Sequence, residues 1–291
     1  MMYNSPRSGR NRRGSKLHRS PAAAHSKAFL ALSALLVLVF ATGGASRADV
    51  ESLPVLRPAA TAFLFLGLYW LNGEHLRAHR FLLLWGGACA ALVLAQLIPL
   101  PPPMWQGLPG RDLIVQIDQA VGLGDHWRPL TMTPAATRNA FWSLMPPLAC
   151  LVLAVQLEPA EHKKVLLLVL ALGLTSGVMG MLQLLGDPKG PLYLYDVTGH
   201  GQAVGLYANR NHQALLLAAM LPMLAAWALT RDGANSARLR ALVATGAGAF
   251  FIPLLLITGS RAGLIMGSVG LVLAGVIIAA TRRHRAGQSA P

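Results

Sequence analysis

Charged residues are scarce in this sequence. Only 12% of its 291 residues are Asp, Glu, Lys or Arg, whereas soluble domains average about 25%. Apolar residues make up 54% of the chain and form long runs in place of alternating or amphipathic stripes. Runs of about 18 or more apolar residues predict membrane helices. The composition therefore argues against a soluble domain and predicts an all-α, polytopic transmembrane helix bundle, because a helix satisfies its own backbone polar groups in lipid.

Cysteine is almost absent as well. Cys89 and Cys150 lie in separate apolar runs, with no paired spacing and no Cys/His cluster nearby. A disulfide framework or a zinc site needs such groupings. We therefore expect two thiols that pack as small apolar side chains, and we expect neither a metal nor another cofactor.

The charge that is present is mostly positive, with a formal net charge of +14. No nucleic-acid recognition motif accompanies the basic residues, so we expect no nucleic-acid partner. Membrane topology and attraction to anionic membrane lipids explain the basic tails and loops better.

Eight apolar segments are expected to cross the membrane: 28–46, 55–71, 81–100, 140–157, 164–185, 211–229, 239–257 and 262–281. Eight crossings return both ends to one side, which the basic amino-terminal tail marks as cytoplasmic. In this orientation 17 of the 25 Lys and Arg residues lie in inner segments and 8 in outer ones. We therefore predict a multi-pass membrane protein with both termini in the cytoplasm. Its parts are a cytoplasmic tail at 1–27, a transmembrane domain at 28–281 and a cytoplasmic tail at 282–291.

Segment 28–46 also resembles a secretory signal peptide, because it follows a basic stretch and ends in small residues. We favour an uncleaved first helix, since the next apolar run follows at once; cleavage is the alternative. Two outer connections are long. The stretch 104–123 in the first is mildly amphipathic and is expected to lie along the membrane interface. The second, 186–210, is rich in Gly, Tyr and His.

The clearest polar motif is Asn209-Arg210-Asn211-His212, where the second outer loop enters the sixth apolar segment. An outward helix amino terminus attracts anions through its free N–H groups and its dipole. Asn209 or Asn211 can cap this helix, and the fork of Arg210 fits phosphate oxygens.

A second motif, Thr258-Gly259-Ser260-Arg261-Ala262-Gly263, turns the chain on the same outer face, with Ser260 as the expected cap. Two outward helix starts, each with an arginine, predict a diphosphate site in which Arg210 and Arg261 share one cavity. The alternative is that these arginines only extend to lipid headgroups.

His200 and His212 are the candidates for a general base on the outer face, because neutral imidazole suits proton abstraction near neutral pH. The alternative for each is a capping or surface histidine. Tyr193, Tyr195 and Tyr207 can stack on sugar rings or belong to the aromatic belt of the membrane interface.

At these residues the sequence resembles the O-antigen ligase and O-antigen polymerase family of bacterial membrane glycosyltransferases. The matching motifs are Ala208–His212 (Ala-Asn-Arg-Asn-His) and Thr258–Gly263, preceded by the outer-loop stretches Leu97–Arg111 and Arg128–Thr137. The resemblance covers roughly residues 55–281, and the order, spacing and common outer placement of the motifs make the set specific.

The resemblance implies transfer of a glycan from undecaprenyl diphosphate to a lipid A core or to another glycan, on the periplasmic face of a bacterial inner membrane. It implies no metal, because the family binds the diphosphate with arginine side chains, and Arg210 and Arg261 match those positions. Family members usually carry a catalytic histidine on a second large periplasmic loop. We find no counterpart of that loop in this sequence. We expect the donor-binding half to be present, and a truncated or split member, a short form and a pseudo-enzyme are the alternatives for the catalytic half.

Two other classes of function stay open. A transporter or flippase of lipid-linked glycans should carry polar groups at mid-membrane, and the middles of these segments are nearly free of charge. Gly173, Thr175, Ser176 and Gly177 are expected to be packing residues. A non-catalytic membrane scaffold is the remaining alternative.

Overall fold

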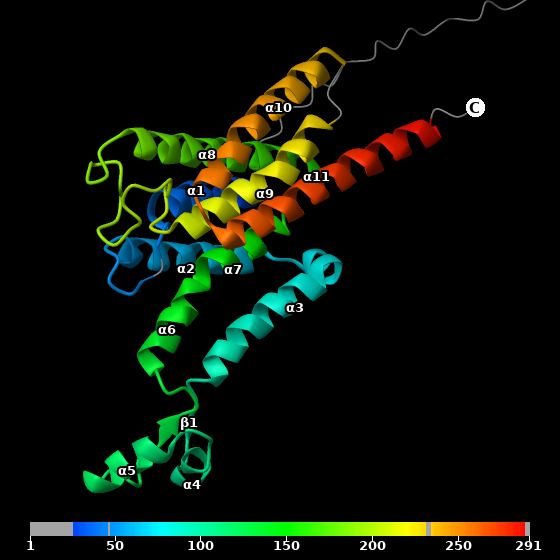
Figure 1. The fold of residues 1–291 in the computed structure, drawn as a ribbon. Helices are drawn as coiled ribbons and strands as arrows, with labels where there is room; N and C mark the ends of the chain where they lie inside the picture. Colours follow the sequence, from blue (N-terminus) through cyan, green and yellow to red (C-terminus); the bar gives the residue numbers. More distant parts are fainter. Residues whose placement is uncertain (1–25, 46, 231–233, 289–291) are drawn as a thin grey trace, which may run out of the picture.

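The computed structural model describes residues 26–45, 47–230 and 234–288 (Figure 1). Most of the predicted basic tail at 1–27 lies outside these residues. The described chain is 72% helix and 2% strand, which confirms the all-α class. Its elements are, in order, α1 (Lys27–Thr42), α2 (Leu53–Trp70), α3 (Gly73–Ala95), β1 (Pro99–Leu100), α4 (Pro102–Gln106), α5 (Asp112–Ala120), β2 (Arg128–Pro129), α6 (Pro134–Ser143), α7 (Met145–Ala154), α8 (Pro159–Leu185), α9 (Arg210–Ala228), α10 (Ala234–Ile257) and α11 (Arg261–Gln288).

Five of the described helices are long and apolar enough to cross a membrane: α2, α3, α8, most of α10 and most of α11. This supports a membrane protein, whereas the predicted count of eight crossings is not confirmed. α1 is apolar but has only 16 residues. The predicted segment 140–157 is not one helix, because Pro146 and Pro147 donate no backbone hydrogen bond and the helix restarts at Met145.

Several predicted boundaries also change. α3 begins at Gly73, eight residues before the predicted start at 81, because Asn72 caps it by accepting hydrogen bonds from the N–H groups of Glu74 and His75. α11 continues to Gln288, into the predicted tail at 282–291. The stretch 104–123 is not one interfacial helix but contains the end of α4 and all of α5.

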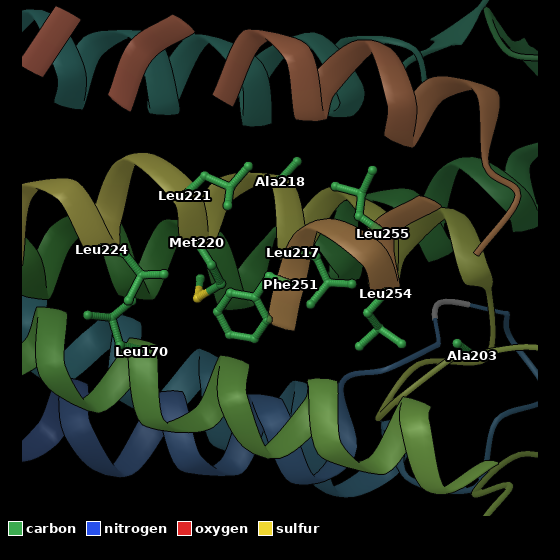
Figure 2. Close-up of a cluster of buried hydrophobic side chains, with 10 residues drawn as sticks. All are labelled: Leu170, Ala203, Leu217, Ala218, Met220, Leu221, Leu224, Phe251, Leu254 and Leu255. Atoms are coloured by element: carbon green, nitrogen blue, oxygen red, sulfur yellow. The ribbon is translucent and has the colours of Figure 1, made fainter. Parts of the chain in front are cut away.

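Two groups of helices bury two apolar cores. α1, α2 and α7 enclose the first, in which Leu35, Ala60 and Leu153 are fully buried. α8, α9 and α10 enclose the second around Leu217 and Phe251, and Figure 2 shows these side chains meeting between the helices. α11 packs along α9, so its start lies beside the start of α9.

Hydrogen bonds between helix ends fix which ends lie together. At one end of the bundle the backbone N–H and hydroxyl of Ser26, before α1, both donate to the Glu161 carboxylate near the start of α8, at 2.8 Å. At the other end the Ala208 N–H, just before α9, donates to the Gly44 carbonyl, just after α1, at 3.0 Å. The loop 186–209 therefore lies at the end opposite to the start of α1, in agreement with the predicted alternation of these helices. We call this the outer end.

The connection between α3 and α6 forms a small folded unit, which we call the 96–133 segment. β1 and β2 pair antiparallel, and the fully buried Trp105 donates its indole N–H to the His126 carbonyl at 3.0 Å. The Asp118 carboxylate is buried and pairs with the Arg128 guanidinium at 2.5 Å. Figure 1 shows this segment below the helix groups, beyond the ends of α3 and α6.

Candidate functional site

The loop 186–209 is fixed to the bundle by a buried glutamine of α8. Gln183 is 1% exposed and makes four hydrogen bonds to the loop. Its amide nitrogen donates to the carbonyls of Leu192 and Gly205, at 2.8 and 2.9 Å. Its amide oxygen accepts the N–H groups of Val204 and Gly205, at 3.0 and 2.8 Å. One side chain thus satisfies four backbone groups that would otherwise be buried without partners.

A second buried pair joins α8, α9 and the same loop. The Ser176 hydroxyl donates to the Gln213 amide oxygen at 2.6 Å, and the Gln213 amide nitrogen donates to the Ser176 carbonyl at 3.1 Å. The Leu206 N–H donates to the Ser176 hydroxyl at 3.1 Å. Gly205 passes over this pair with φ of +59°, and a Cβ there would lie 2.4 Å from the Gln213 oxygen. Ser176 was predicted as a packing residue, and the structure corrects this, because its hydroxyl bonds both a helix and the loop.

Tyrosines complete the attachment of the loop. The buried Tyr193 hydroxyl accepts the Gly201 N–H at 2.9 Å and donates toward the Gln183 carbonyl at 3.2 Å. The Tyr195 hydroxyl accepts the Gly44 N–H, after α1, at 2.9 Å. Burial raises the pKa of Tyr195 and of Tyr207 above the ordinary tyrosine value. These roles favour loop-fixing tyrosines over an aromatic belt for Tyr193 and Tyr195.

At the start of α9 the predicted cap is present. The Asn209 side chain accepts the Asn211 N–H at 2.8 Å, so Asn209, and not Asn211, is the capping residue. Asn211 and His212 are exposed in the first turn, and Arg210 is half-buried. Arg210 has no hydrogen bond or ion pair within the described part of the chain. Its permanent charge is therefore available at a helix amino terminus, where the helix dipole also favours anions.

The start of α11 is next to the start of α9. Ser260 caps α11 by accepting the Gly263 N–H at 2.9 Å, as predicted. A Cβ at Gly263 would lie 2.4 Å from the Ala214 Cβ, which shows how closely the two helices approach. The turn before α11 needs Gly259, whose φ is +64°, and a Cβ there would lie 3.5 Å from the Arg210 Nη1 atom. The Arg210 guanidinium thus lies against the turn that begins α11.

A cavity of about 480 Å³ opens at this place. It is lined by the chain after α1, by the loop 186–209 and by the first turn of α9, including Arg47, Gln202, Asn209, Arg210, Asn211 and His212. Two arginines from distant parts of the sequence therefore line one cavity, and no carboxylate is among its described lining residues. An adjoining hollow of about 330 Å³ shares Arg47 and carries the carboxylates Asp49, Glu51 and Asp196.

Arg47 is a site residue that the sequence analysis did not single out. It is exposed, and its guanidinium pairs with the Asp49 carboxylate at 3.0 and 2.7 Å. Hydrogen bonding to Arg47 lowers the pKa of Asp49, so this carboxyl is ionised near neutral pH. No motif surrounds Arg47, and only the tertiary contact between the end of α1 and the loop 186–209 brings it into one cavity with Arg210.

Of the remaining predicted site residues, some line this cavity and others do not. Arg261 is exposed, and of the arginines predicted to share one cavity only Arg210 lines this one, as far as the described residues show. His212 lines it, with its ring 6.1 Å from that of Tyr207. His200 does not, since its Nδ1 atom is 2.8 Å from the Pro188 carbonyl and its ring packs on Tyr193. The geometry therefore favours His212 over His200 as a base, and gives His200 a place in the loop structure.

The described residues contain no group of three or more His, Cys, Asp or Glu side chains that could hold a metal ion. Both cysteines are free thiols and partly buried. Comparison of the chain with protein-family models, with curated proteins and with solved structures gave no match.

Proposed function

We propose that this chain is a membrane glycosyltransferase of the O-antigen ligase or polymerase type. It would take a glycan from undecaprenyl diphosphate at the periplasmic face of the bacterial inner membrane and pass it to a lipid A core or polysaccharide acceptor. The observation that supports this most is the cavity with Arg210 and Arg47, no carboxylate in its described lining, and the start of α9 directed into it. Arg210 and the helix start attract a compact multiply charged anion, and a diphosphate has that character; Arg47, already paired with Asp49, adds a smaller contribution.

The proposed orientation has eight crossings and both termini in the cytoplasm. The bias of Lys and Arg toward the inner segments supports it. Five described helices can cross a membrane by length and composition; the proposal adds α1, the α6–α7 pair and α9 as shorter or broken crossings. The outer end then faces the periplasm, together with the cavity.

The chemistry follows from the charges. An acceptor hydroxyl oxygen attacks the anomeric carbon of the donor sugar, the bond from that carbon to the diphosphate oxygen breaks, and the hydroxyl proton passes to a base. Negative charge grows on the departing diphosphate in the transition state. Fixed positive groups lower this barrier because they need no reorganisation as the charge develops. Arg210 and the α9 amino terminus supply such groups, Arg261 extends from the neighbouring helix start, and His212 is the base that the cavity offers.

The test measures donor binding and glycan transfer with the purified chain in nanodiscs, using undecaprenyl diphosphate as the binding probe. Replacing Arg210 by Ala should remove a charge-assisted contact, which costs on the order of 1.5–3 kcal/mol. Binding should therefore weaken roughly tenfold to a hundredfold. Arg261→Ala should have a smaller effect, because its side chain does not line the cavity. Arg210→Lys should restore part of the loss, since a lysine keeps the charge but not the fork.

Lys189→Gln is the matched control, because this exposed cation belongs to the same loop but does not line the cavity. Unchanged binding in the Arg210→Ala, Arg261→Ala double variant would refute a diphosphate site at these helix starts. His212→Ala separates the remaining possibilities. If transfer stops while donor binding persists, His212 is the base. If the wild-type chain binds donor but transfers nothing, the scaffold class is favoured.

A further inference from the structure

Arg57 on α2 is a cation that has no counterion among the described residues. Its Nη2 atom donates to the Asn139 side-chain oxygen at 2.5 Å and, more weakly, to the Ser143 hydroxyl at 3.4 Å, both on α6. Its Nε atom is buried and has no hydrogen-bond partner. Among the described residues no carboxylate pairs with it. The guanidinium thus has only neutral partners, and one of its N–H groups has none.

An apolar groove of about 650 Å³ begins at this arginine. Its lining includes Leu53, Pro54, Pro58 and Phe65 of α2, with Trp142 of α6 on the other side. Arg57 is the single charged residue among the described lining residues. The volume of the groove lies within the range of about 300–1,000 Å³ that is typical of sites that bind small molecules.

The groove and the cation together indicate the chemical character of a ligand that fits there. α2 is one of the five helices that can cross a membrane by length and composition, and in the proposed orientation the groove would face lipid near the outer end of this helix. A half-buried cation in such surroundings costs free energy unless an anion or water neutralises it. None of the described lining residues is an anion, and the remaining lining is apolar except for Thr61, whose hydroxyl donates to the Arg57 carbonyl. The ligand must therefore join one negative group to a long apolar chain.

We propose that this groove binds an anionic phospholipid of the membrane, with its phosphate on the Arg57 guanidinium and one acyl chain along Pro58, Phe65 and Trp142. The proposal requires a membrane location but not the glycosyltransferase activity. It also accounts for an arginine on the outer side of α2, which the inward bias of basic residues disfavours.

Trp142 makes the groove observable, because its indole lines it and is quenched by bromine atoms on a nearby acyl chain. The chain is reconstituted in nanodiscs with brominated phosphatidylglycerol or brominated phosphatidylcholine, and the signal of Trp142 is obtained by difference from Trp142→Phe. One cation near the headgroup should favour the anionic lipid about fivefold. Arg57→Gln should abolish this preference, while Arg57→Lys, which keeps the charge, should retain most of it.

Arg138→Gln is the matched control, since Arg138 is exposed on α6, next to Asn139, and does not line the groove. Ala62→Leu, which fills the groove, should reduce quenching by both lipids. Equal quenching by the two lipids in the wild-type chain, or a preference that survives Arg57→Gln, would overturn the proposal. Displacement of the brominated lipid by a stoichiometric amount of undecaprenyl phosphate would also overturn it, because the groove would then belong to a prenyl chain.

Discussion

The two long outer connections hold their shape in different ways. The loop 186–209 is hydrogen-bonded to α8 through the buried side chains of Gln183 and Ser176, and Gln213 of α9 is hydrogen-bonded to Ser176. The 96–133 segment is held by its own residues, with Trp105 at its centre and the Asp118–Arg128 ion pair beside it. One loop is thus an extension of the bundle, whereas the other is a small unit joined to it by α3 and α6.

This difference decides which arginines are available to a ligand. In the 96–133 segment Arg111 is buried and donates to the carbonyls of Pro129 and Leu130, and Arg128 pairs with Asp118. Both cations are occupied in holding the segment together. At the loop 186–209 the neutral side chains of Gln183 and Ser176 on α8 hold the loop, and Arg210 has no partner among the described residues. A loop fixed by neutral groups can leave its cation for an anion from outside.

The largest expected effect is the loss of Gln183. Gln183→Leu leaves two carbonyls and two N–H groups of the loop without partners, and each such buried group costs about 1–3 kcal/mol. We expect destabilisation on the order of 4 kcal/mol, seen as a large drop in the thermal midpoint in detergent together with loss of diphosphate binding. Gln119→Leu is the control, because Gln119 is exposed in the 96–133 segment. A Gln183→Leu chain with unchanged midpoint and binding would show that the loop does not depend on the bundle.

Helix caps and helices could be predicted from the sequence, whereas contacts between residues far apart in the sequence could not. The cap at Ser260 was predicted, and Asn209 was one of the two caps predicted for α9, because a cap depends on residues within three positions. The apolar runs located the long helices, because an apolar run is also a local feature of the sequence. The early start of α3 could have been found from Asn72, whose capping position precedes Glu74 and His75. The break before Pro146 and Pro147 could also have been predicted from these prolines, but the continuous apolar run around them led to the prediction of one segment.

Gln183 and Gln213 show what the sequence could not reveal. A single glutamine in an apolar helix signals that some partner exists, because its amide must be bonded when buried. It does not say which backbone groups those are, and in this chain they lie 9 to 37 positions away. Arg47 is harder still, since its place in the cavity depends on the end of α1 meeting the loop 186–209. The chain position of Arg47 alone gave no sign of a site.

A smaller effect should separate Arg47 from Arg128. Arg47 is exposed and already paired with Asp49, so its contribution to anion binding is that of a screened surface charge, about 0.2–1 kcal/mol. Arg47→Gln should weaken undecaprenyl diphosphate binding roughly twofold to fivefold, with the difference shrinking at high salt. Arg128→Gln should loosen the 96–133 segment and leave binding unchanged. If Arg128→Gln weakened binding more than Arg47→Gln, the assignment of anion binding to the cavity at the loop 186–209, and not to the 96–133 segment, would be wrong.

The smallest effect appears only in acid. The Arg128 guanidinium lowers the pKa of the Asp118 carboxyl below its ordinary value, which is near 3.9. Between the lowered pKa and the ordinary one, the unfolded segment binds more protons than the folded one, so stability falls as the pH falls. The ion pair should therefore contribute fully above about pH 4 and be lost below it. The side chains that attach the loop 186–209 to α8 contain no carboxylate, and within the loop the exposed Asp187 carboxylate accepts only the Lys189 N–H, so the loop should respond less in the same range. Pepsin cleavage, normalised to a peptide standard, should accelerate in the 96–133 segment as the pH is lowered from about 4, and less in the loop.

Asp118→Asn should be cleaved faster than the wild-type segment at the upper end of this range and should lose the pH response. A pH response that persists in Asp118→Asn would assign the acid sensitivity to another group.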